Sequence, residues 1–330
     1  MAHLSAMCSY CATYSAASER YVIEQGGTLS VRKHSSFHYA RRITGAIVRH
    51  PANRAHRARA LSRAIGWQLY KRSVRRPREI KYAGFRLRCY PDSHSASNIF
   101  YFGSLYDWHE MRFLRRYLRP GDGFVDVGAN IGTYTLLAAS LVGPRGSVDA
   151  FEPSPVAAGL LRESVTLNQL SNVCVHETAI GDANGTTEFS IGWDVTDSVY
   201  TPADPYQQLR PRIEVELARL DDVLTDRPYS AGKLDVEGLE LAALRGATAH
   251  LEAANPPVWQ IEVLANQLRK FGTSVNDLFA LLREHEYEVF IFDSDSNELI
   301  NDHDAVNQAS NVLAIAHPNL ADVASRINER

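Results

Sequence analysis

The stretch GFVDVGANIGTYTLLAASLV (123–142) decides the fold class. Its first residues, GFVDV, form an apolar run typical of a buried strand, and a turn with two glycines follows. The apolar segment from Thr133 onward predicts a helix, which the pair Gly143-Pro144 ends. A strand that leads through such a turn into a helix is the opening unit of an α/β fold.

The same alternation continues to the end of the chain. Further strands are predicted at 147–153, 172–180, 233–238, 257–264, 287–293 and 311–317. Helices are predicted between them at 155–170, 240–251 and 274–285. Because strands and helices alternate with short loops, we expect a doubly wound, mainly parallel sheet. A β-rich insert at about 183–215 interrupts the pattern, and we expect it to shape the pocket of a substrate.

Charge divides the chain into two parts. Residues 1–120 hold 22 Lys+Arg and six Asp+Glu, whereas the remaining 210 residues hold 13 basic and 32 acidic residues. This asymmetry predicts a basic N-terminal extension (1–80), partly helical and partly disordered, joined to an acidic domain (81–330).

The basic extension allows two interpretations. Residues 41–88 hold 15 Lys+Arg and one acid, with Ile43, Ile47, Leu61, Ile65 and Leu69 at roughly helical spacing. Such a helix could lie on an anionic membrane through residues 41–78 or on nucleic acid. We favour packing against the acidic domain, and expect no nucleic-acid partner, because no aromatic stacking pattern accompanies the charge. The sequence does not indicate an oligomeric state.

Composition excludes several classes of protein. No apolar run reaches about 18 residues, so no transmembrane segment is expected. The N-terminus lacks the apolar region of a secretory signal, and four cysteines are too few for a disulfide framework. We therefore expect a cytoplasmic protein. Cys8 and Cys11 form a single CxxC without further ligands at zinc spacing, so no metal site is predicted there.

The predicted ligand site lies at the carboxyl ends of the strands, where open α/β sheets bind ligands. Gly128 and Gly132 flank the first strand-to-helix turn, and glycine lets the backbone approach a ligand closely. Glu152 follows Gly128 by 24 residues, about where an acid accepts hydrogen bonds from both hydroxyls of a ribose. A purely structural turn is the alternative.

The details of this turn select among nucleotide-like ligands. A nicotinamide fingerprint needs G-x-G-x-x-G, but Asn130 and Thr133 occupy the second and third glycine positions; a P-loop is also absent. Asp126 at the strand end would repel a phosphate and attract an ammonium group. Ribose, adenine and a cationic amino-acid tail together describe S-adenosylmethionine.

At these residues the sequence resembles the FkbM-type methyltransferases, S-adenosylmethionine-dependent enzymes that mostly methylate hydroxyls of natural products or sugars. The resemblance covers about residues 95–317 and rests on an ordered set of motifs: DVGANIGTYTLLAA (126–139), AFEPSP (150–155), AIGD (179–182), KLDVEGLELAALRGA (233–247) and PPVWQIE (256–262). It implies a Rossmann-like class I methyltransferase fold with a seven-stranded, mainly parallel sheet. Tyr229-Ser230-Ala231-Gly232 before Lys233 is less apolar than is usual in the family, so we expect that strand to be short.

The resemblance also implies roles for individual residues. The cofactor-binding residues would be Asp126, Gly128, Asn130, Gly132, Glu152, Ile180, Gly181 and Asp182. Tyr106 and Glu110 would close over the cofactor. Asp235, Glu237 and Glu262 would face a small-molecule or glycan hydroxyl and serve as the catalytic residues.

The chemistry of these three acids leaves alternatives open. An alcohol must lose its proton to attack a methyl group, so Asp235 could act as the general base with the other two as structural acceptors. The three carboxylates could equally coordinate Mg²⁺, although we favour no metal. Two rival functions remain: a nucleic-acid methyltransferase that uses the basic arm as its grip, and a non-catalytic binding module that kept the fold.

Overall fold

The computed structural model describes residues 19–23, 29–33, 36–103, 105–192 and 197–329. The predicted CxxC and most of the predicted disordered N-terminus lie outside these ranges. Within the described part of the chain, no helix combines the length and the apolarity needed to cross a membrane.

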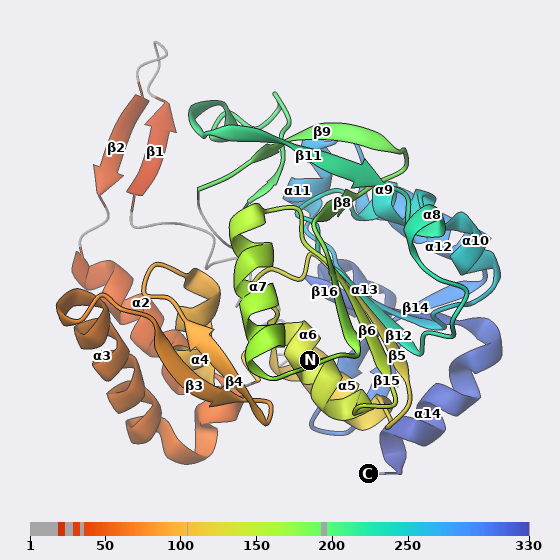
Figure 1. Cartoon of the computed structure of the whole chain (residues 1–330), viewed down its shortest axis with the longest axis horizontal. Coiled ribbons are helices and arrows are strands. Elements are labelled where there is room, and N and C mark those ends of the chain that lie inside the picture. The colour runs from red at the N-terminus through yellow and green to blue at the C-terminus, as the bar shows by residue number, and fades with distance from the viewer. Residues whose placement is uncertain (1–18, 24–28, 34–35, 104, 193–196, 330) are drawn as a thin grey trace.

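The centre of the molecule is an eight-stranded sheet (Figure 1). In spatial order it consists of β15 (Glu298–Ile300), β14 (Tyr287–Asp293), β16 (Asn311–Ala316), β13 (Val258–Glu262), β12 (Ala231–Leu234), β5 (Gly123–Val127), β6 (Ser147–Phe151) and β7 (Val173–His176). The five strands from β13 to β7 are parallel, and the other three pair antiparallel. The α/β, mainly parallel architecture is confirmed. The predicted count of seven is wrong by one, because the three-residue β15 is too short to show a periodic pattern.

Helices cover both faces of this sheet. One face carries α5 (Trp108–Tyr117), α6 (Thr133–Val142), α7 (Pro155–Leu167) and α14 (Leu320–Asn328). The other carries α8 (Leu220–Val223), α9 (Glu240–Arg245), α10 (Thr248–Glu252) and α12 (Val275–Glu284). The short α11 (Ala265–Lys270) and α13 (His303–Gln308) follow β13 and β15.

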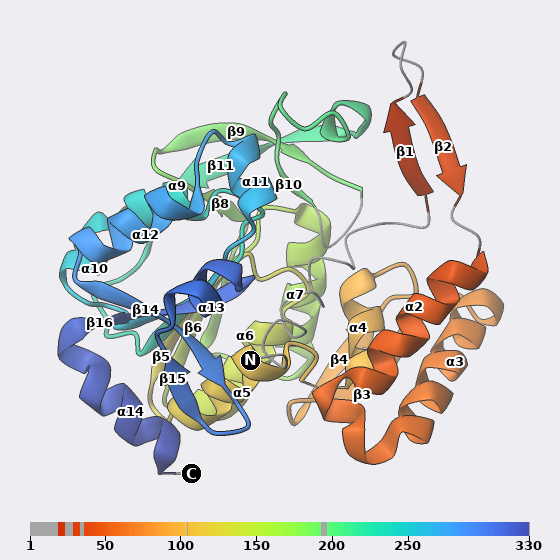
Figure 2. The ribbon, with the colours of Figure 1, turned by 180° about the vertical axis from the view of Figure 1, so that it is seen from behind.

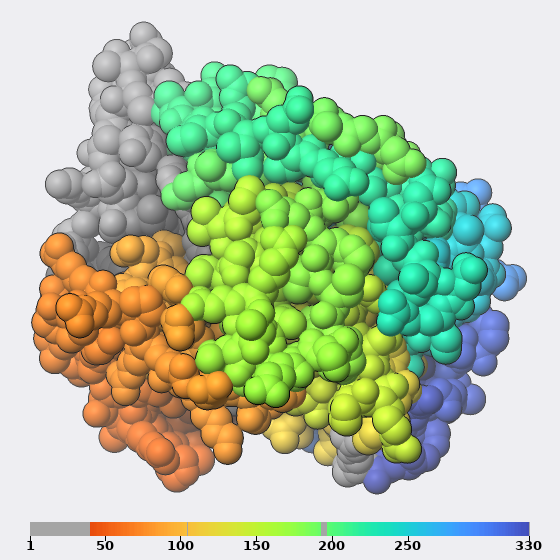
Figure 3. Space-filling model, in the orientation of Figure 1, coloured from red at the N-terminus to blue at the C-terminus, as the bar shows by residue number. Residues whose placement is uncertain are grey.

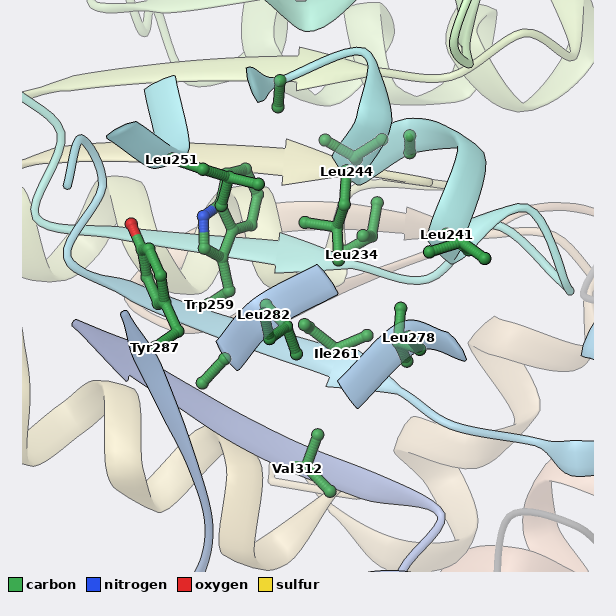
Figure 4. Close-up of a cluster of buried hydrophobic side chains, with 14 of the residues drawn as sticks. Leu234, Leu241, Leu244, Leu251, Trp259, Ile261, Leu278, Leu282, Tyr287 and Val312 are labelled. Carbon is green, nitrogen blue, oxygen red and sulfur yellow. The ribbon is translucent and has the colours of Figure 1, made fainter. Parts of the chain in front are cut away.

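The register of the parallel strands aligns a row of polar side chains. Asp126 of β5 pairs with Lys233 of β12, which pairs with Gln260 of β13. Because side chains alternate across a strand, these three point to the face that carries α5, whereas Leu234 and Ile261 point to the opposite hydrophobic core (Figure 4). β12 has four residues, so the expected short strand is confirmed.

A second, four-stranded sheet contains the predicted β-rich insert. Its strands in spatial order are β10 (Ser198–Val199), β9 (Gly185–Ser190), β11 (Arg212–Ala218) and β8 (Thr178–Ile180). β8 follows β7 of the central sheet along the chain, so the second sheet begins at the edge where the parallel strands end.

The N-terminal segment is helical and packs beside the central sheet (Figures 1 and 2). It contains the strand pair β1 (Glu19–Ile23) and β2 (Leu29–Lys33), then α2 (Ser36–Arg49), α3 (Arg57–Ser73), the hairpin β3 (Arg78–Tyr82) and β4 (Phe85–Cys89), and α4 (His94–Phe102). The division predicted between residues 80 and 81 falls inside β3, and it stays a prediction.

This segment shares a hydrophobic core with the rest of the chain. Trp67 is fully buried and stacks on Phe100, with ring centroids 3.9 Å apart, and Leu136 of α6 belongs to the same core. The hairpin also lies against α7, as the orange and yellow-green surfaces show in Figure 3. The Arg86 backbone N–H donates to Oδ1 of Asn168, the residue after α7, at 2.7 Å. The favoured interpretation, packing against the acidic domain, agrees with these contacts.

The predicted apolar stripe of this segment is only partly buried. Ile47 is in the core, but Ile65 and Leu69 are each 60% exposed. Helix α3 instead buries the face that carries Ala64 and Trp67. Both faces of α3 contain apolar residues, so spacing alone could not select the buried one. Membrane contact through residues 41–78 stays a prediction.

Candidate functional site

A cavity opens where β5, β6, β12 and β13 end. Asp126, Gly128, Asn130, Glu152, Ile180, Asp235, Glu237 and Glu262 all line it, as do Phe189 and Asp197 of the insert. The residues at the ends of β5, β6, β12 and β13 are distant in the sequence, and the carboxyl edge of the parallel sheet brings them together, as strand order predicted. Ile180, Phe189 and Asp197 belong to the second sheet or to the loop beside it.

Asp126 forms the base of this cavity. Its side chain is fully buried, and Thr135 Oγ1 donates to Oδ2 at 2.5 Å. The other oxygen, Oδ1, has no hydrogen-bond partner among the described residues. Burial raises the pKa of Asp126, although the nearby Lys233 ammonium opposes that shift. A cationic group in the cavity would satisfy Oδ1 and keep the carboxylate ionised.

Glu152 lies at the end of β6 and is 6% exposed. Its Oε2 accepts the Asn130 N–H at 2.8 Å, and its Oε1 accepts the Ser154 N–H at 2.9 Å. Burial raises the pKa of Glu152 to about 7, although these hydrogen bonds act in the opposite direction. The two backbone donors fix the orientation of the carboxylate, and each oxygen keeps a lone pair that can accept a hydroxyl.

The two glycines of the turn are required for packing within the protein. Gly128 has φ +83°, and a Cβ there would lie 1.8 Å from the carbonyl oxygen of Asp235. Gly132 has φ +88°, and a Cβ there would lie 2.2 Å from a methyl group of Leu161. The sequence argument expected a ligand at these close approaches. The structure places the end of β12 against Gly128 and helix α7 against Gly132.

Three predicted cofactor residues do not line the cavity. Gly132 faces Leu161, as described above. The backbone N–H of Gly181 bonds to the carbonyl of Ala218 in the second sheet, and Asp182 is exposed. Cofactor contacts of these three residues stay predictions, whereas Ile180 does reach the cavity wall.

The three predicted catalytic acids converge at the ends of β12 and β13. Carboxylate oxygens of Asp235, Glu237 and Glu262 lie within 4.8 Å of one another. Burial and the neighbouring carboxylates raise the pKa of Glu237 to about 8 and that of Glu262 well above its usual value. Gln267 Nε2 donates to Glu237 Oε2 at 2.6 Å, whereas Glu262 Oε2 has no hydrogen-bond partner among the described residues. The cluster therefore retains protons at neutral pH.

Lys233 joins this cluster, and sequence reasoning did not assign it a role. Its Nζ donates to Asp235 Oδ2 at 2.6 Å and lies 4.7 Å from the centre of the Tyr134 ring. Burial alone would lower the pKa of Lys233, but the carboxylates of Asp235 and Asp126 raise it above its usual value. The available signal in the sequence was a lysine in the strand predicted at 233–238, since core strands rarely contain a charged residue.

The N-terminal segment supplies a second group of unpredicted residues. His50, Ser95, Asn98 and Phe102 all line the cavity. Ser95 Oγ donates to Asn130 Oδ1 at 2.9 Å, which connects α4 to the turn after β5. No sequence motif marks these residues, because their position depends on how the segment docks.

Tyr106 and Glu110, the two residues expected to close over the cofactor, line different cavities in the structure. Tyr106 lines the cavity, and its hydroxyl lies 2.7 Å from Thr133 Oγ1. His50 Nε2 lies 2.7 Å from the Tyr106 carbonyl oxygen, and burial lowers the pKa of His50 to about 4, so that the neutral ring donates this hydrogen bond. Glu110 instead lines a second cavity beside the first.

The residues present fit S-adenosylmethionine on two structural grounds. The unpartnered Oδ1 of Asp126 suits the ammonium group of the methionine part. The oriented carboxylate of Glu152 suits the two ribose hydroxyls, and Ile180 offers an apolar surface to the adenine.

Comparisons with known proteins give the family. Residues 126–289 match the methyltransferase FkbM domain. The 31-O-demethyl-FK506 methyltransferase FkbM of Streptomyces tacrolimicus is 30% identical over 202 residues, which cover 52% of this chain and 75% of that relative.

Two solved structures are more distant. One is the methyltransferase FkbM of Methylobacillus flagellatus, with 18% identity, a TM-score of 0.39, and coverage of 67% of this chain and 54% of that one. The other is an S-adenosylmethionine-dependent O-methyltransferase of Thermotoga maritima, with 15% identity, a TM-score of 0.33 and 60% coverage of each chain. This chain thus spans about half the length of the solved FkbM-type protein. From the matched domain and the Streptomyces relative, we conclude that the chain belongs to the FkbM family of S-adenosylmethionine-dependent methyltransferases.

Proposed function

We propose that this methyltransferase methylates a hydroxyl group of a sugar or natural product. The observation that carries the proposal is the group of three carboxylates, within 4.8 Å of one another, on the wall of the cavity that fits the cofactor. The name of the Streptomyces relative describes methyl transfer to an oxygen and supports the same chemistry.

Asp126 and Glu152 would hold the cofactor by its ammonium group and its ribose. When bound, S-adenosylmethionine supplies a methyl group that its sulfonium has already activated. The walls of the cavity would align the acceptor oxygen with that methyl group, and orientation of this kind can lower a barrier by roughly 7–11 kcal/mol.

Asp235 would take the proton of the acceptor hydroxyl, which contributes about 10²–10⁴-fold to a rate. Lys233 holds Oδ2 of Asp235 at 2.6 Å, and Oδ1 would face the acceptor. Glu237 and Glu262, with their raised pKa values, would remain protonated at neutral pH and donate hydrogen bonds to other oxygens of the acceptor.

The same carboxylates could hold Mg²⁺ through oxygen ligands. We favour the reaction without metal because Lys233 already places a positive charge beside Asp235. A metal on the same carboxylate would be repelled by that ammonium, which disfavours both cations at Asp235 at once.

Replacing Asp235 by Asn tests the proposal. We expect turnover to fall at least about 100-fold, because the base is lost, while affinity for S-adenosylhomocysteine changes less than about threefold. Turnover is measured as S-adenosylhomocysteine released from S-adenosylmethionine with a panel of hydroxylated macrolides and sugars, in the presence and absence of EDTA. Asp226→Asn, at an exposed position, is the matched control. Full turnover in Asp235→Asn, or a methyl group found on nitrogen in the product, would refute the assignment.

A further inference from the structure

A second cavity, of about 630 Å³, lies at the same edge of the central sheet. Its walls come from β13, β14 and β16, with Glu110 of α5 and Ala305 of α13 at its sides. Asn311, at the start of β16, lines both this cavity and the one that fits the cofactor. The two cavities therefore adjoin at this residue.

The floor of the second cavity is apolar where Phe292 and Leu313 line it. Both residues are less than 8% exposed and belong to the hydrophobic core on the α5 side of the sheet. A cavity of this size with an apolar floor suits a ring system or a chain of a small organic molecule.

Gln260 is a buried polar residue that also lines this cavity, and it is 4% exposed. Its Nε2 donates to the Glu110 carbonyl oxygen at 2.9 Å, while its Oε1 has no hydrogen-bond partner among the described residues. The opposite orientation of the amide would place Oε1 against that carbonyl oxygen, so Oε1 is the atom left free. A buried acceptor without a partner is costly, and a hydroxyl in the cavity would satisfy it.

Gln260 also connects the cavity to the reacting groups. Gln260 and Glu262 are two residues apart on β13, so their side chains point to the same face at a spacing of about 6.6 Å. A molecule whose apolar body fills the second cavity would therefore reach the carboxylates with its polar end.

We propose that the second cavity binds the apolar body of the methyl acceptor, and that Gln260 Oε1 accepts a hydrogen bond from one of its hydroxyls. This inference rests on the proposed function and narrows its acceptor to a compound with an apolar ring or chain that carries at least two hydroxyls. One hydroxyl is recognised by Gln260, and another is presented to Asp235.

Cyclooctanol and cyclooctanone are suitable probes, because they differ in little except the hydroxyl donor. Their binding to the protein saturated with S-adenosylhomocysteine is measured by ligand-observed NMR. We expect cyclooctanol to bind about fivefold more tightly than cyclooctanone, the effect of one hydrogen bond. Gln260→Leu should remove this difference.

Ala305→Phe fills the cavity from α13 and keeps the test valid if Gln260→Leu fails to fold. We expect it to weaken binding of both probes at least about tenfold, with an unchanged affinity for S-adenosylhomocysteine. Ala324→Phe, at an exposed position of α14, is the matched control. Unchanged probe binding in Ala305→Phe, or no binding to the loaded wild-type protein, would overturn the inference about the cavity alone. A wild-type protein that does not bind S-adenosylhomocysteine would instead refute the proposed function.

Discussion

Replacing Lys233 by Met removes the positive charge from the cluster of carboxylates and keeps a side chain of similar length. The Lys233 side chain is 9% exposed, and its Nζ lies 2.6 Å from Asp235 Oδ2. Its loss leaves the carboxylates of Asp126 and Asp235 without their neighbouring cation. We expect a lower free energy of unfolding, and an Asp235 side chain that is held less firmly in its present orientation.

The magnitude follows from the burial of the two partners. Breaking a buried ion pair by removing one partner costs about 3–5 kcal/mol. The Asp235 side chain is 33% exposed, so water can solvate it in part after the substitution. We therefore expect Lys233→Met to lower the free energy of unfolding by about 2–3 kcal/mol. Asp235→Asn should cost less, about 1–2 kcal/mol, because Lys233 keeps Asp126 as a neighbour.

A double-mutant cycle isolates the pair. The free energies of unfolding of the wild type, Lys233→Met, Asp235→Asn and the double variant are measured by urea denaturation with tryptophan fluorescence. We expect a coupling energy of about 1–3 kcal/mol. A coupling energy below about 0.5 kcal/mol would refute the reasoning, since the lysine would then be held by something other than Asp235.

Two further predictions concern other buried carboxyl groups. Glu152→Ala should weaken binding of S-adenosylhomocysteine about 10- to 100-fold in calorimetry, because the acceptor proposed for both ribose hydroxyls is lost. The exposed Glu284→Ala should leave the affinity unchanged. A change of less than about threefold in Glu152→Ala would contradict the assigned role. Burial raises the pKa values of Glu110, Glu152 and Glu240 to about 7 and that of Glu237 to about 8, so the folded protein retains protons that the unfolded chain releases. The stabilisation by these protons is complete below the ordinary glutamate pKa and is lost as the pH rises through 7 to 8. The melting temperature should therefore fall between pH 6.5 and 8.5, and Glu240→Gln should make this fall shallower. A melting temperature that rises over this range would contradict the prediction.

The sequence predicted the parallel strands and the residues at their ends because both depend on local patterns. Short apolar runs followed by turns placed Asp126, Glu152 and Asp235 at one edge before any contact was known. The structure brings those three residues to one cavity. Such residues are predictable because the carboxyl ends of parallel strands lie at the same edge of the sheet, whatever the exact register of the strands.

Features that depend on tertiary packing could not be predicted. The spacing of Ile65 and Leu69 resembles that of a buried stripe, yet the opposite face of α3 is buried because Trp67 finds an aromatic partner in Phe100. Lys233 lies opposite Asp126 on a neighbouring strand, more than 100 residues away in the sequence, so its place in the site could not be predicted from local patterns. The cavity around Gln260 likewise requires α5 and α13 to be placed.

The hydrogen bond from Ser95 to Asn130 has a consequence for how the enzyme can be divided. Ser95 precedes the matched domain, which begins at residue 126, yet it touches the turn after β5 that is proposed to bind the cofactor. A grafted fragment of residues 126–289 would contain the whole matched domain but lack the side of the cavity that α4 forms. Exchange between family members should therefore include the helices upstream, so that the boundary of a transferable unit lies before α4.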